Sequence, residues 1–474
     1  MANLLIPCSG PGTRSSGYTK FHKALIRVGN CAVLSHIINS YKDIDTIYVM
    51  LGYQSHLIKQ YLDHCDYPNI EYIEIENWQE SQFASLKQIP QSVFDQPFYL
   101  NSCDNWSTSV EPQTQTTAFF CSPSNSQYYD IVDGHSFAGM GYVHNSKQFY
   151  HELHNSTASR NDYLIYQKLD PQHVQLTDWY DVGNLESFQL TQDIFKDDFE
   201  LLDKIHQEIY YVNNRFIKLF NHDISSIEKS ITSNLTYPHP APVKFTEQGL
   251  SYNFVDGVLN PQGTQFETLF ENLQNYWNFC LNNNNSVINK DIWQHKTFER
   301  FEALVKKYPE LSSTIYINGV EVDPVRTIEY LDWKIINTGI VGSCHGDLNL
   351  DNIIVGDDSI HYIDHRSSIV NDIFYDICKF YHSLQMNNSI IKNFELGHNG
   401  IDRYTVDVSM TPEDKIRLQI FENTVLYKQH RKKILLGVGC IWLSMSPLNV
   451  DDELNKFLFL YAIKHLHETT NELL

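Results

Sequence analysis

Residues 344–366 read CHGDLNLDNIIVGDDSIHYIDHR. Two short apolar runs flank a Gly-Asp-Asp turn at 356–358, which predicts a β-hairpin. Asp347 precedes the first strand, Asn352 stands at its start, and Asp364 stands at the end of the second strand. The hairpin is therefore predicted to bring Asn352 and Asp364 side by side, with Asp347 nearby. The two strands are expected at 353–355 and 361–363.

These three side chains match what phosphoryl transfer from a nucleoside triphosphate requires. One carboxylate, Asp347, can orient the attacking hydroxyl and accept its proton. An amide oxygen from Asn352 and the carboxylate of Asp364 can hold Mg²⁺ on the phosphates. The alternative interpretation is a surface hairpin that carries solvated acids.

The spacing of the whole stretch resembles the aminoglycoside phosphotransferase and choline kinase family. The resemblance implies a two-lobed protein-kinase-like α+β domain, with Asp347 as the catalytic base and Asn352 and Asp364 as magnesium ligands. In the following run DIFYDICKFYHSL, Asp376 is similar to the acid that braces the catalytic loop in that family. We interpret His345 as a residue that stabilises the loop.

A kinase also needs a lysine on the nucleotide phosphates and an acid that holds the lysine. Residues 208–220 alternate in polarity and turn at Asn213-Asn214, which predicts a hairpin in the small lobe. Lys218 on its second strand is the candidate nucleotide-binding lysine, and Glu228 is its candidate partner. The alternative for Lys218 is an ordinary lysine on an exposed strand. No convincing glycine-rich loop precedes this strand, and residues 249–260 are expected to contain the hinge between the lobes.

The first 40 residues suggest a second, separate chemistry. An apolar strand at 4–6 runs into the loop Ser-Gly-Pro-Gly-Thr-Arg at 9–14. Small residues let the backbone approach a nucleotide, and its N–H groups can bind phosphates. Lys23 follows the loop, and an amphipathic helix is predicted at 33–40. The third glycine of the dinucleotide-binding fingerprint is missing, and so is the P-loop lysine signature.

Strands and helices alternate over the first 190 residues. We expect strands at 46–54, 70–75 and 97–106, with a helix at 56–62 and Asp104 at the end of the last strand. Such alternation predicts a Rossmann-like α/β sheet whose ligands bind at the carboxyl ends of the strands.

This region resembles the sugar-phosphate nucleotidyltransferase family. The family's loop is Gly-x-Gly-Thr-Arg followed by Pro-Lys, and the matching residues here are Gly10, Gly12, Thr13, Arg14, His22 and Lys23. His22 replaces the proline. The resemblance implies that Gly10, Gly12 and Thr13 bind the nucleotide, that Arg14 and Lys23 are catalytic, and that Asp104 and Asp181 bind Mg²⁺.

Nucleotidyl transfer requires a phosphate monoester to approach a nucleoside triphosphate. Both are anions, so cations have to neutralise their charge. Arg14, Lys23 and magnesium held by two carboxylates could supply that charge. The alternatives are simpler: a helix N-cap for Asp181, a turn residue for Asp104, and solvated loop charges for the two cations.

The composition limits the classes of partner. The chain has 474 residues and a formal net charge of −22, which argues against nucleic acid and anionic membranes as partners. Nine scattered cysteines and the lack of a secretory signal favour a reducing, cytoplasmic location. The longest apolar run, at 434–445, is too short to span a bilayer and is expected to be a buried helix.

The expected domains follow from these patterns. They are a nucleotidyltransferase domain at 1–195, a connecting helix at 196–207, a kinase small lobe at 208–262 and a mostly helical kinase large lobe at 263–474.

The pairing suggests two consecutive reactions, with Mg²⁺ as the metal. A small sugar or sugar-like alcohol would be phosphorylated with ATP and then coupled to CTP, UTP or GTP, giving an activated donor for surface polysaccharide. One alternative is a choline, ethanolamine or polyol kinase joined to a CTP:phospho-alcohol cytidylyltransferase. Tyr404, Tyr427 and Trp442 are the aromatic residues that could then surround a quaternary amine. Another alternative is a kinase-like unit that binds ligands without catalysis.

Overall fold

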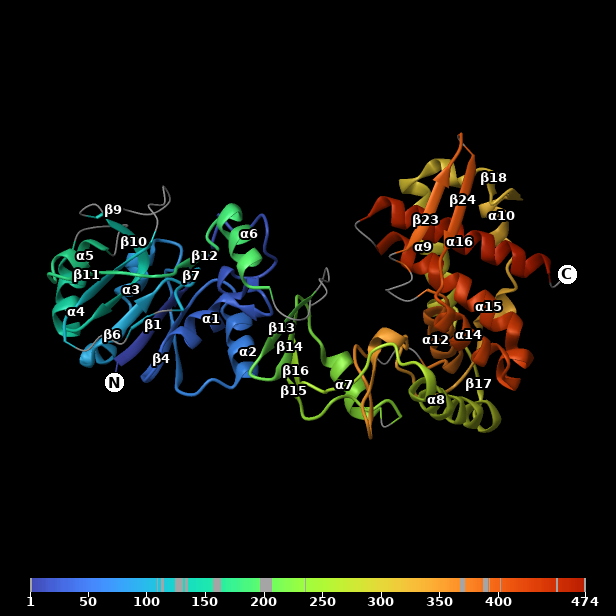
Figure 1. Ribbon diagram of the computed structural model, residues 1–474, viewed down its shortest axis with the longest axis horizontal. Helices are drawn as coiled ribbons and strands as arrows, with labels where there is room; N and C mark the ends of the chain where they lie inside the picture. The colour runs from blue at the N-terminus through green and yellow to red at the C-terminus, as the bar shows by residue number, and fades with distance from the viewer. Residues whose placement is uncertain are drawn as a thin grey trace. The chain divides into compact units, whose positions relative to one another are not determined.

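The protein forms two compact units in a computed structural model. The structure describes residues 2–108, 110–111, 115–123, 131–132, 135–156, 163–196, 207–234, 236–366, 371–386, 391, 393–400, 402–448 and 451–472. Unit 1 comprises Met1–Ile224 and Pro242–Phe254, and unit 2 comprises Ser225–Ala241 and Val255–Leu474. Figure 1 shows both units and labels many of their helices and strands.

A mixed β-sheet forms the centre of unit 1. Its strands are β1 (Ala2–Cys8), β4 (Ile44–Leu51), β5 (Ile70–Glu74), β6 (Phe98–Asn101), β8 (Ala118–Cys121), β9 (Ile131–Val132), β10 (His135–Val143) and β11 (Gln172–Gln175). The order is β11-β8-β10-β6-β1-β4-β5, and β9 pairs with β10. Strands β6, β1, β4 and β5 run parallel, whereas β10 is antiparallel to β6 and β8. The carboxyl ends of the parallel strands therefore meet at one edge of the sheet.

Both faces of this sheet are buried along its central strands, which are apolar at successive positions. Along β1, Leu4 and Ile6 belong to one hydrophobic cluster, and Leu5 belongs to a second cluster on the other face. The helices of unit 1 are α1 (Val33–Ser40), α2 (Ser55–Cys65), α3 (Gln82–Leu86), α4 (Ser146–Asn155), α5 (Tyr163–Gln167) and α6 (Leu185–Ile194).

Two short strand pairs complete the main part of unit 1. They are β2 (Arg27–Val28) with β3 (Cys31–Ala32), and β7 (Asn105–Trp106) with β12 (Tyr180–Asp181). The expected strand at 97–106 is interrupted, since β6 ends at Asn101 and Asp104 lies in the turn before β7. The side chain of Asn101 donates to the carbonyls of Ser102 and Asn105, which stabilises that turn.

A small antiparallel sheet follows, in the order β13-β14-β16-β15. Its strands are β13 (Gln207–Val212), β14 (Arg215–Phe220), β15 (Val243–Phe245) and β16 (Gly249–Asn253). The predicted hairpin is present, and Asn213 and Asn214 at its turn have φ of 51° and 62°. Two successive positive φ values are typical of the tight turns that join antiparallel strands.

This small sheet, which the sequence assigned to a kinase lobe, belongs to unit 1. Its buried residues Tyr210 and Ile217 are part of the hydrophobic cluster that covers one face of the central sheet. The buried His64 of α2 bonds with Ser251 Oγ (2.9 Å) and Thr246 Oγ1 (3.1 Å). The two units divide after Ile224 and after Phe254, instead of near residue 195. Most of the expected connecting helix at 196–207 lies outside the described residues.

Helices make up most of unit 2 and enclose one hydrophobic core. They are α7 (Ser225–Ser233), α8 (Gly263–Asn283), α9 (Lys296–Lys307), α10 (Pro324–Glu329), α11 (Trp333–Asn337), α12 (Ile373–Gln385), α14 (Pro412–Glu422), α15 (Val425–Met445) and α16 (Asp452–Asn471). The apolar run at 434–445 forms the buried half of α15, as expected. Among the described residues, no helix is both long enough and apolar enough to cross a membrane.

The strands of unit 2 include the predicted hairpin and a sheet that the sequence did not predict. The hairpin pairs β21 (Ile353–Val355) with β22 (Ile360–Tyr362). A sheet with the order β19-β18-β24-β23 consists of β18 (Ile315–Ile317), β19 (Val320–Val322), β23 (Phe394–His398) and β24 (Arg403–Val408). A further pair joins β17 (Ser286–Ile288) and β20 (Thr338–Ile340).

Candidate active sites

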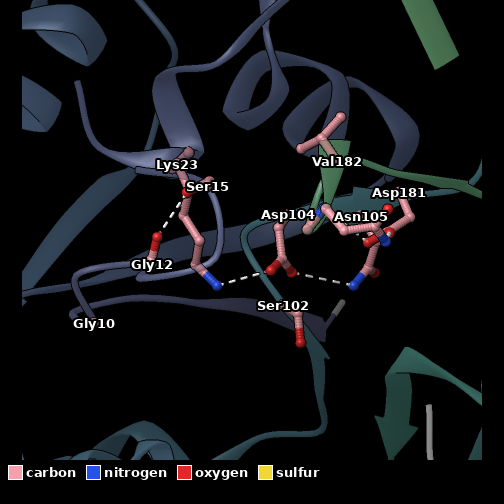
Figure 2. Close-up of polar contacts among 12 residues, drawn as sticks. Gly10, Gly12, Ser15, Lys23, Ser102, Asp104, Asn105, Asp181 and Val182 are labelled. Carbon is pink, nitrogen blue, oxygen red and sulfur yellow. Dashed lines mark hydrogen bonds and ion pairs between the residues drawn. The ribbon is translucent and has the colours of Figure 1, made fainter. Parts of the chain in front are cut away.

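The glycine-rich loop of unit 1 begins where β1 ends. Gly12 has a φ of +61°, and its carbonyl accepts hydrogen bonds from the backbone N–H (3.0 Å) and the Oγ (2.8 Å) of Ser15. A Cβ at Gly12 would lie 3.0 Å from Cδ of Lys23, so a side chain there would press on the lysine. Figure 2 shows Lys23 passing beside this loop toward Asp104. Glycine is therefore needed at position 12 both for the turn and for the path of Lys23.

His22 stands where the family that this region resembles has a proline, and its ring hydrogen-bonds to the loop. Its Nδ1 accepts a hydrogen bond from the N–H of Ala24 (3.1 Å), so its Nε2 carries the proton and donates to the Gly10 carbonyl (2.8 Å). Burial, with the nearby charge of Lys23, lowers the pKa of His22 to about 4. The neutral imidazole thus connects the loop to the residue next to Lys23, a role that the sequence did not suggest.

Lys23 and Asp104 form a largely buried ion pair. The distance from Nζ of Lys23 to Oδ2 of Asp104 is 2.8 Å, and the two side chains are 21% and 9% exposed. Burial opposes charge on both groups, but their mutual attraction is stronger: the pKa of Lys23 is raised and that of Asp104 is lowered. Both groups therefore stay charged at neutral pH.

Asp181 lies beside this pair because β12 pairs with β7. Asp181 is opposite Asn105, and the N–H of Val182 donates to the Asp104 carbonyl (2.9 Å). A Cβ on Gly183 would lie 3.1 Å from Oδ1 of Asp181 and 3.4 Å from Oδ2 of Asp104. The two carboxylates therefore converge on one place (Figure 2). The N-cap of α6 is Asn184 instead of Asp181, so the helix-cap interpretation of Asp181 was wrong.

Arg14 and Thr13 are exposed on the loop. The charge of Arg14 is among the causes that lower the pKa of Asp104, which places this cation within electrostatic range of the ion pair. Sequence analysis missed Tyr18, whose hydroxyl donates to the Val182 carbonyl (2.5 Å). Burial, together with Asp181 and Asp104, raises the pKa of Tyr18 to about 12. The tyrosine thus connects the loop to the strand that carries Asp181.

The paired carboxylates of Asp104 and Asp181 have the chemistry to hold Mg²⁺. Within the described part of the chain, no group of three or more His, Cys, Asp or Glu side chains could hold a metal. Mg²⁺ commonly binds through one or two carboxylates, substrate phosphates and water, so a pair is sufficient. Asp104 and Asp181 supply the hard oxygen atoms that this ion prefers.

In unit 2, α12 holds the loop that contains Asp347. The carboxylate of Asp376 accepts hydrogen bonds from the N–H groups of His345 (2.7 Å) and Gly346 (2.9 Å). Burial raises the pKa of Asp376 to about 7, and the two N–H donors act against that rise. The fully buried ring of His345 bonds with the carbonyl of Ile363 (3.0 Å), which ties the loop to the end of the hairpin. Asp376 and His345 therefore both stabilise the loop.

The Asp347 carboxylate contacts two cations. Nζ of Lys379 lies 2.9 Å from Oδ1, and Nη2 of Arg366 lies 3.1 Å from Oδ2. Burial alone would raise the pKa of Asp347, but the charges of Lys379 and Arg366 outweigh it and hold the pKa well below its usual range. Sequence analysis missed both cations. The only available signal for Lys379 was its position three residues after Asp376, which places both on one face of α12.

Asn352 lies beside Asp347 because the chain makes a short turn at Leu350–Asn352, just before β21. Nδ2 of Asn352 donates to the Asp347 carbonyl (2.9 Å), which leaves the carbonyl oxygen of the amide as the group that can bind a cation. The N–H of Ile363 donates to the Asn352 carbonyl (2.9 Å), and Asp364 follows with a φ of +62°. Asp364 lies past the end of β22 and within electrostatic range of His345. An amide oxygen and a carboxylate are both ligands that Mg²⁺ accepts, and the assignment of Asn352 and Asp364 to the metal stays a prediction.

The remaining predicted nucleotide-binding residues lie in different units. Lys218 is buried on β14 in unit 1, with its Nζ 5.5 Å from the centre of the Tyr252 ring. Glu228 is exposed on α7 in unit 2. Their pairing stays a prediction.

The aromatic residues that we considered for a quaternary-amine site are core residues. Tyr404, Tyr427 and Trp442 are all buried in the hydrophobic cluster of unit 2. Trp442 packs against Tyr461 and His465, at ring distances of 4.8 and 4.9 Å.

No protein-family model matches the chain, and no curated protein matches it in sequence. Several solved structures align with its N-terminal region. The CTP:phosphocholine cytidylyltransferase of Streptococcus pneumoniae is 15% identical, with coverage of 41% of this chain and 99% of that protein and a TM-score of 0.35. A putative glucose-1-phosphate thymidylyltransferase from Bacillus anthracis is 13% identical, with coverage of 43% and 98% and a TM-score of 0.35. The inositol-1-phosphate CTP transferase from T. maritima is 15% identical, with coverage of 41% and 96% and a TM-score of 0.34.

Mild acid is expected to destabilise the protein through its buried histidines. Burial lowers the pKa values of five of them to between about 3 and about 4: His22, His64, His345, His382 and His465. The unfolded chain binds these protons near the ordinary pKa of about 6.5. The free energy of unfolding should therefore fall as the pH is lowered from about 6.5 to about 4, by up to about 3 kcal/mol for each histidine.

Urea unfolding followed by circular dichroism at several pH values measures this effect. In the variant His64→Gln, the free energy of unfolding of unit 1 should depend less steeply on pH. The control His222→Gln changes an exposed histidine and should keep the wild-type dependence. A midpoint that stays constant from pH 7 to pH 4.5 would contradict the prediction.

Proposed function

We propose that the chain is a bifunctional enzyme. Unit 2 would transfer the γ-phosphoryl group of ATP to a hydroxyl of a small sugar or sugar-like alcohol. Unit 1 would then couple the resulting phosphate ester to a second nucleoside triphosphate and release pyrophosphate. The observation that carries the proposal is the convergence of Asp104, Asp181 and Lys23 next to a glycine-rich loop at the carboxyl end of β1.

In unit 1, an oxygen of the phosphate ester would attack the α-phosphorus of the nucleoside triphosphate. A bond forms between that oxygen and the α-phosphorus, and the bond from the α-phosphorus to the bridging oxygen breaks. Lys23 and Arg14 would lower the repulsion between the two anions and stabilise the departing pyrophosphate. Mg²⁺ bound by Asp104 and Asp181 would supply additional positive charge. The backbone around Gly10, Gly12 and Thr13 would bind the nucleotide.

In unit 2, the acceptor hydroxyl would donate a hydrogen bond to the ionised carboxylate of Asp347. The hydroxyl oxygen attacks the γ-phosphorus, the bond to the β–γ bridging oxygen breaks, and ADP leaves. The hydroxyl proton passes to Asp347 as the new bond forms. Mg²⁺ bound by Asn352 and Asp364 would neutralise charge on the phosphates.

The two reactions fit one after the other because the first makes the ester that the second consumes. A sugar is favoured over choline, since the aromatic residues considered for an amine site are packed in the core. The product would be a nucleotide-activated donor of the kind used for surface polysaccharide, made in the cytoplasm. The second nucleotide would be CTP, UTP or GTP.

A two-step assay tests the proposal. Purified protein with Mg²⁺-ATP is incubated with sugars, polyols and amino alcohols, and ADP release is measured. The phosphorylated form of each active acceptor is then supplied with each nucleoside triphosphate, and pyrophosphate release is measured. The proposal is supported if an acceptor gives ADP release and its phosphorylated form gives pyrophosphate release. The absence of pyrophosphate release with every combination would reject the function of unit 1.

The second candidate is a unit 2 that binds a ligand without catalysis. Contacts from Lys379 and Arg366 to the Asp347 carboxylate favour this alternative, because they compete with a hydroxyl for its oxygen atoms. No ADP release across the whole panel, together with pyrophosphate release from supplied phosphate esters, would identify this alternative.

A further inference from the structure

The backbone of Arg366 is hydrogen-bonded to the loop that contains Asp347. Its backbone N–H donates to the His345 carbonyl (3.0 Å), which joins the segment after the hairpin to the loop. Gly346 has a φ of +80°, and a Cβ at this position would lie 2.8 Å from Cβ of Arg366. The absence of a side chain at position 346 therefore lets the arginine lie over the loop.

The two cations on Asp347 differ in their surroundings. The Lys379 side chain is 12% exposed and the Arg366 side chain is 68% exposed. Lys379 contacts Oδ1, while Nε (3.3 Å) and Nη2 (3.1 Å) of Arg366 both contact Oδ2. Both pairs use the same largely buried carboxylate, but water can replace it as the partner of the exposed guanidinium more easily than as the partner of the buried ammonium. Arg366 can therefore leave the Asp347 carboxylate for another anion at a small cost in free energy, whereas Lys379 cannot.

A reaction at Asp347 would need such a mobile cation. The acceptor hydroxyl must be hydrogen-bonded to the Asp347 carboxylate. The γ-phosphoryl group that the hydroxyl attacks must therefore come close to this negative charge. Charge on the transferring group spreads over its three outer oxygens in the transition state. A guanidinium has five N–H donors in one plane and pairs well with phosphoryl oxygens. Arg366 is placed where it could release Oδ2 and bind those oxygens.

We propose that Arg366 binds the transferring phosphoryl group as a catalytic residue, and that Lys379 is the positioning residue that holds Asp347 during this exchange. The proposal rests on the kinase function proposed for unit 2. Lys379 and Asp376 lie three residues apart on α12, so one rigid helix holds both the backbone of the loop and its carboxylate.

The test compares Arg366→Gln, Arg366→Lys, Lys379→Met and Lys379→Arg in the full chain. The matched control is Arg326→Gln, because Arg326 is also an exposed arginine paired with an aspartate. The rate of ADP release gives kcat and KM for the best acceptor. A second measurement compares the Kd of Mg²⁺-ADP with that of the β,γ-imido analogue of Mg²⁺-ATP. The Kd measurements use Asp104→Asn protein, so that the nucleotide site of unit 1 contributes little.

Arg366→Gln should lower kcat by about 10²-fold or more with little change in the KM of the acceptor. It should also weaken the preference for the triphosphate analogue over ADP by about tenfold, because only the analogue carries a γ-phosphoryl group. Arg366→Lys should recover part of the kcat and part of the preference for the triphosphate analogue. Lys379→Met should lower kcat without changing the nucleotide preference, and Lys379→Arg should restore part of the rate. The control should match the wild type.

Other results would reject the proposal. Wild-type kcat and nucleotide preference in Arg366→Gln would exclude contact between Arg366 and the phosphoryl group, even if the wild type is an active kinase. Wild-type kcat in Lys379→Met would exclude the positioning role. Wild-type protein that neither releases ADP nor binds either nucleotide in unit 2 would reject the kinase function itself, and this inference with it.

Discussion

Asp347→Asn is expected to lower the kcat of ADP release by about 10³-fold, the loss that is typical when a general base is removed. The amide keeps the size of the carboxylate but cannot accept the hydroxyl proton. It also loses the charge that attracts Lys379 and Arg366, whose contacts of 2.9 and 3.1 Å depend on that charge. The change should act mainly on kcat, because other groups are proposed to hold the nucleotide.

Initial rates of ADP release with the best acceptor measure this effect. The matched control is Asp357→Asn, which removes an exposed aspartate from the turn of the same hairpin and should leave the rate unchanged. Pyrophosphate release from a supplied phosphate ester should also be unaffected, since that reaction is assigned to unit 1. Full ADP release by Asp347→Asn would remove the proposed base from the mechanism.

Asp104→Asn is expected to lower the rate of pyrophosphate release by at least about 10²-fold. The substitution removes one of two converging carboxylates, so a shared magnesium ion would be bound by Asp181 alone. It also leaves the largely buried Lys23 without the carboxylate 2.8 Å away that keeps its pKa raised. Both effects disturb the cations that nucleotidyl transfer needs.

Pyrophosphate release with a saturating phosphate ester and nucleoside triphosphate is the measurement. Glu186→Gln is the control, because Glu186 is exposed in the first turn of α6, close in sequence to Asp181. ADP release by unit 2 should persist in Asp104→Asn protein. Loss of both activities in this variant would show that the two sites are not independent.

Local patterns predicted the elements that contribute most to both candidate sites. The strand at 4–6, the helix at 33–40, and the hairpins that turn at 213–214 and 356–358 were all found, with strand ends that differ by a few residues. These elements depend on interactions between near neighbours: apolar periodicity, and turn residues that accept positive φ. The family resemblance, and not these patterns, singled out Asp104 and Asp181. The interruption of the strand before Asp104 depends on the side chain of Asn101.

Contacts between distant residues were not predictable in the same way. An apolar strand face indicates that something covers it, but not which part of the chain does so. The small sheet at 207–253 therefore matched a kinase lobe in sequence, yet it packs against α2 and the core of unit 1. His22 was interpreted as a departure from a motif, yet it holds the loop through Gly10.

The sequence by itself determined which chemical groups are available and which short segments carry them, because turns and periodicity are encoded within a few residues. Only the tertiary structure decided that Lys23 pairs with Asp104 and that Lys379 and Arg366 both contact Asp347. Those pairs join residues that lie 19 to 81 positions apart along the chain, so no local pattern specifies them. Packing brings such charges together, and burial then makes each charge depend on its partner.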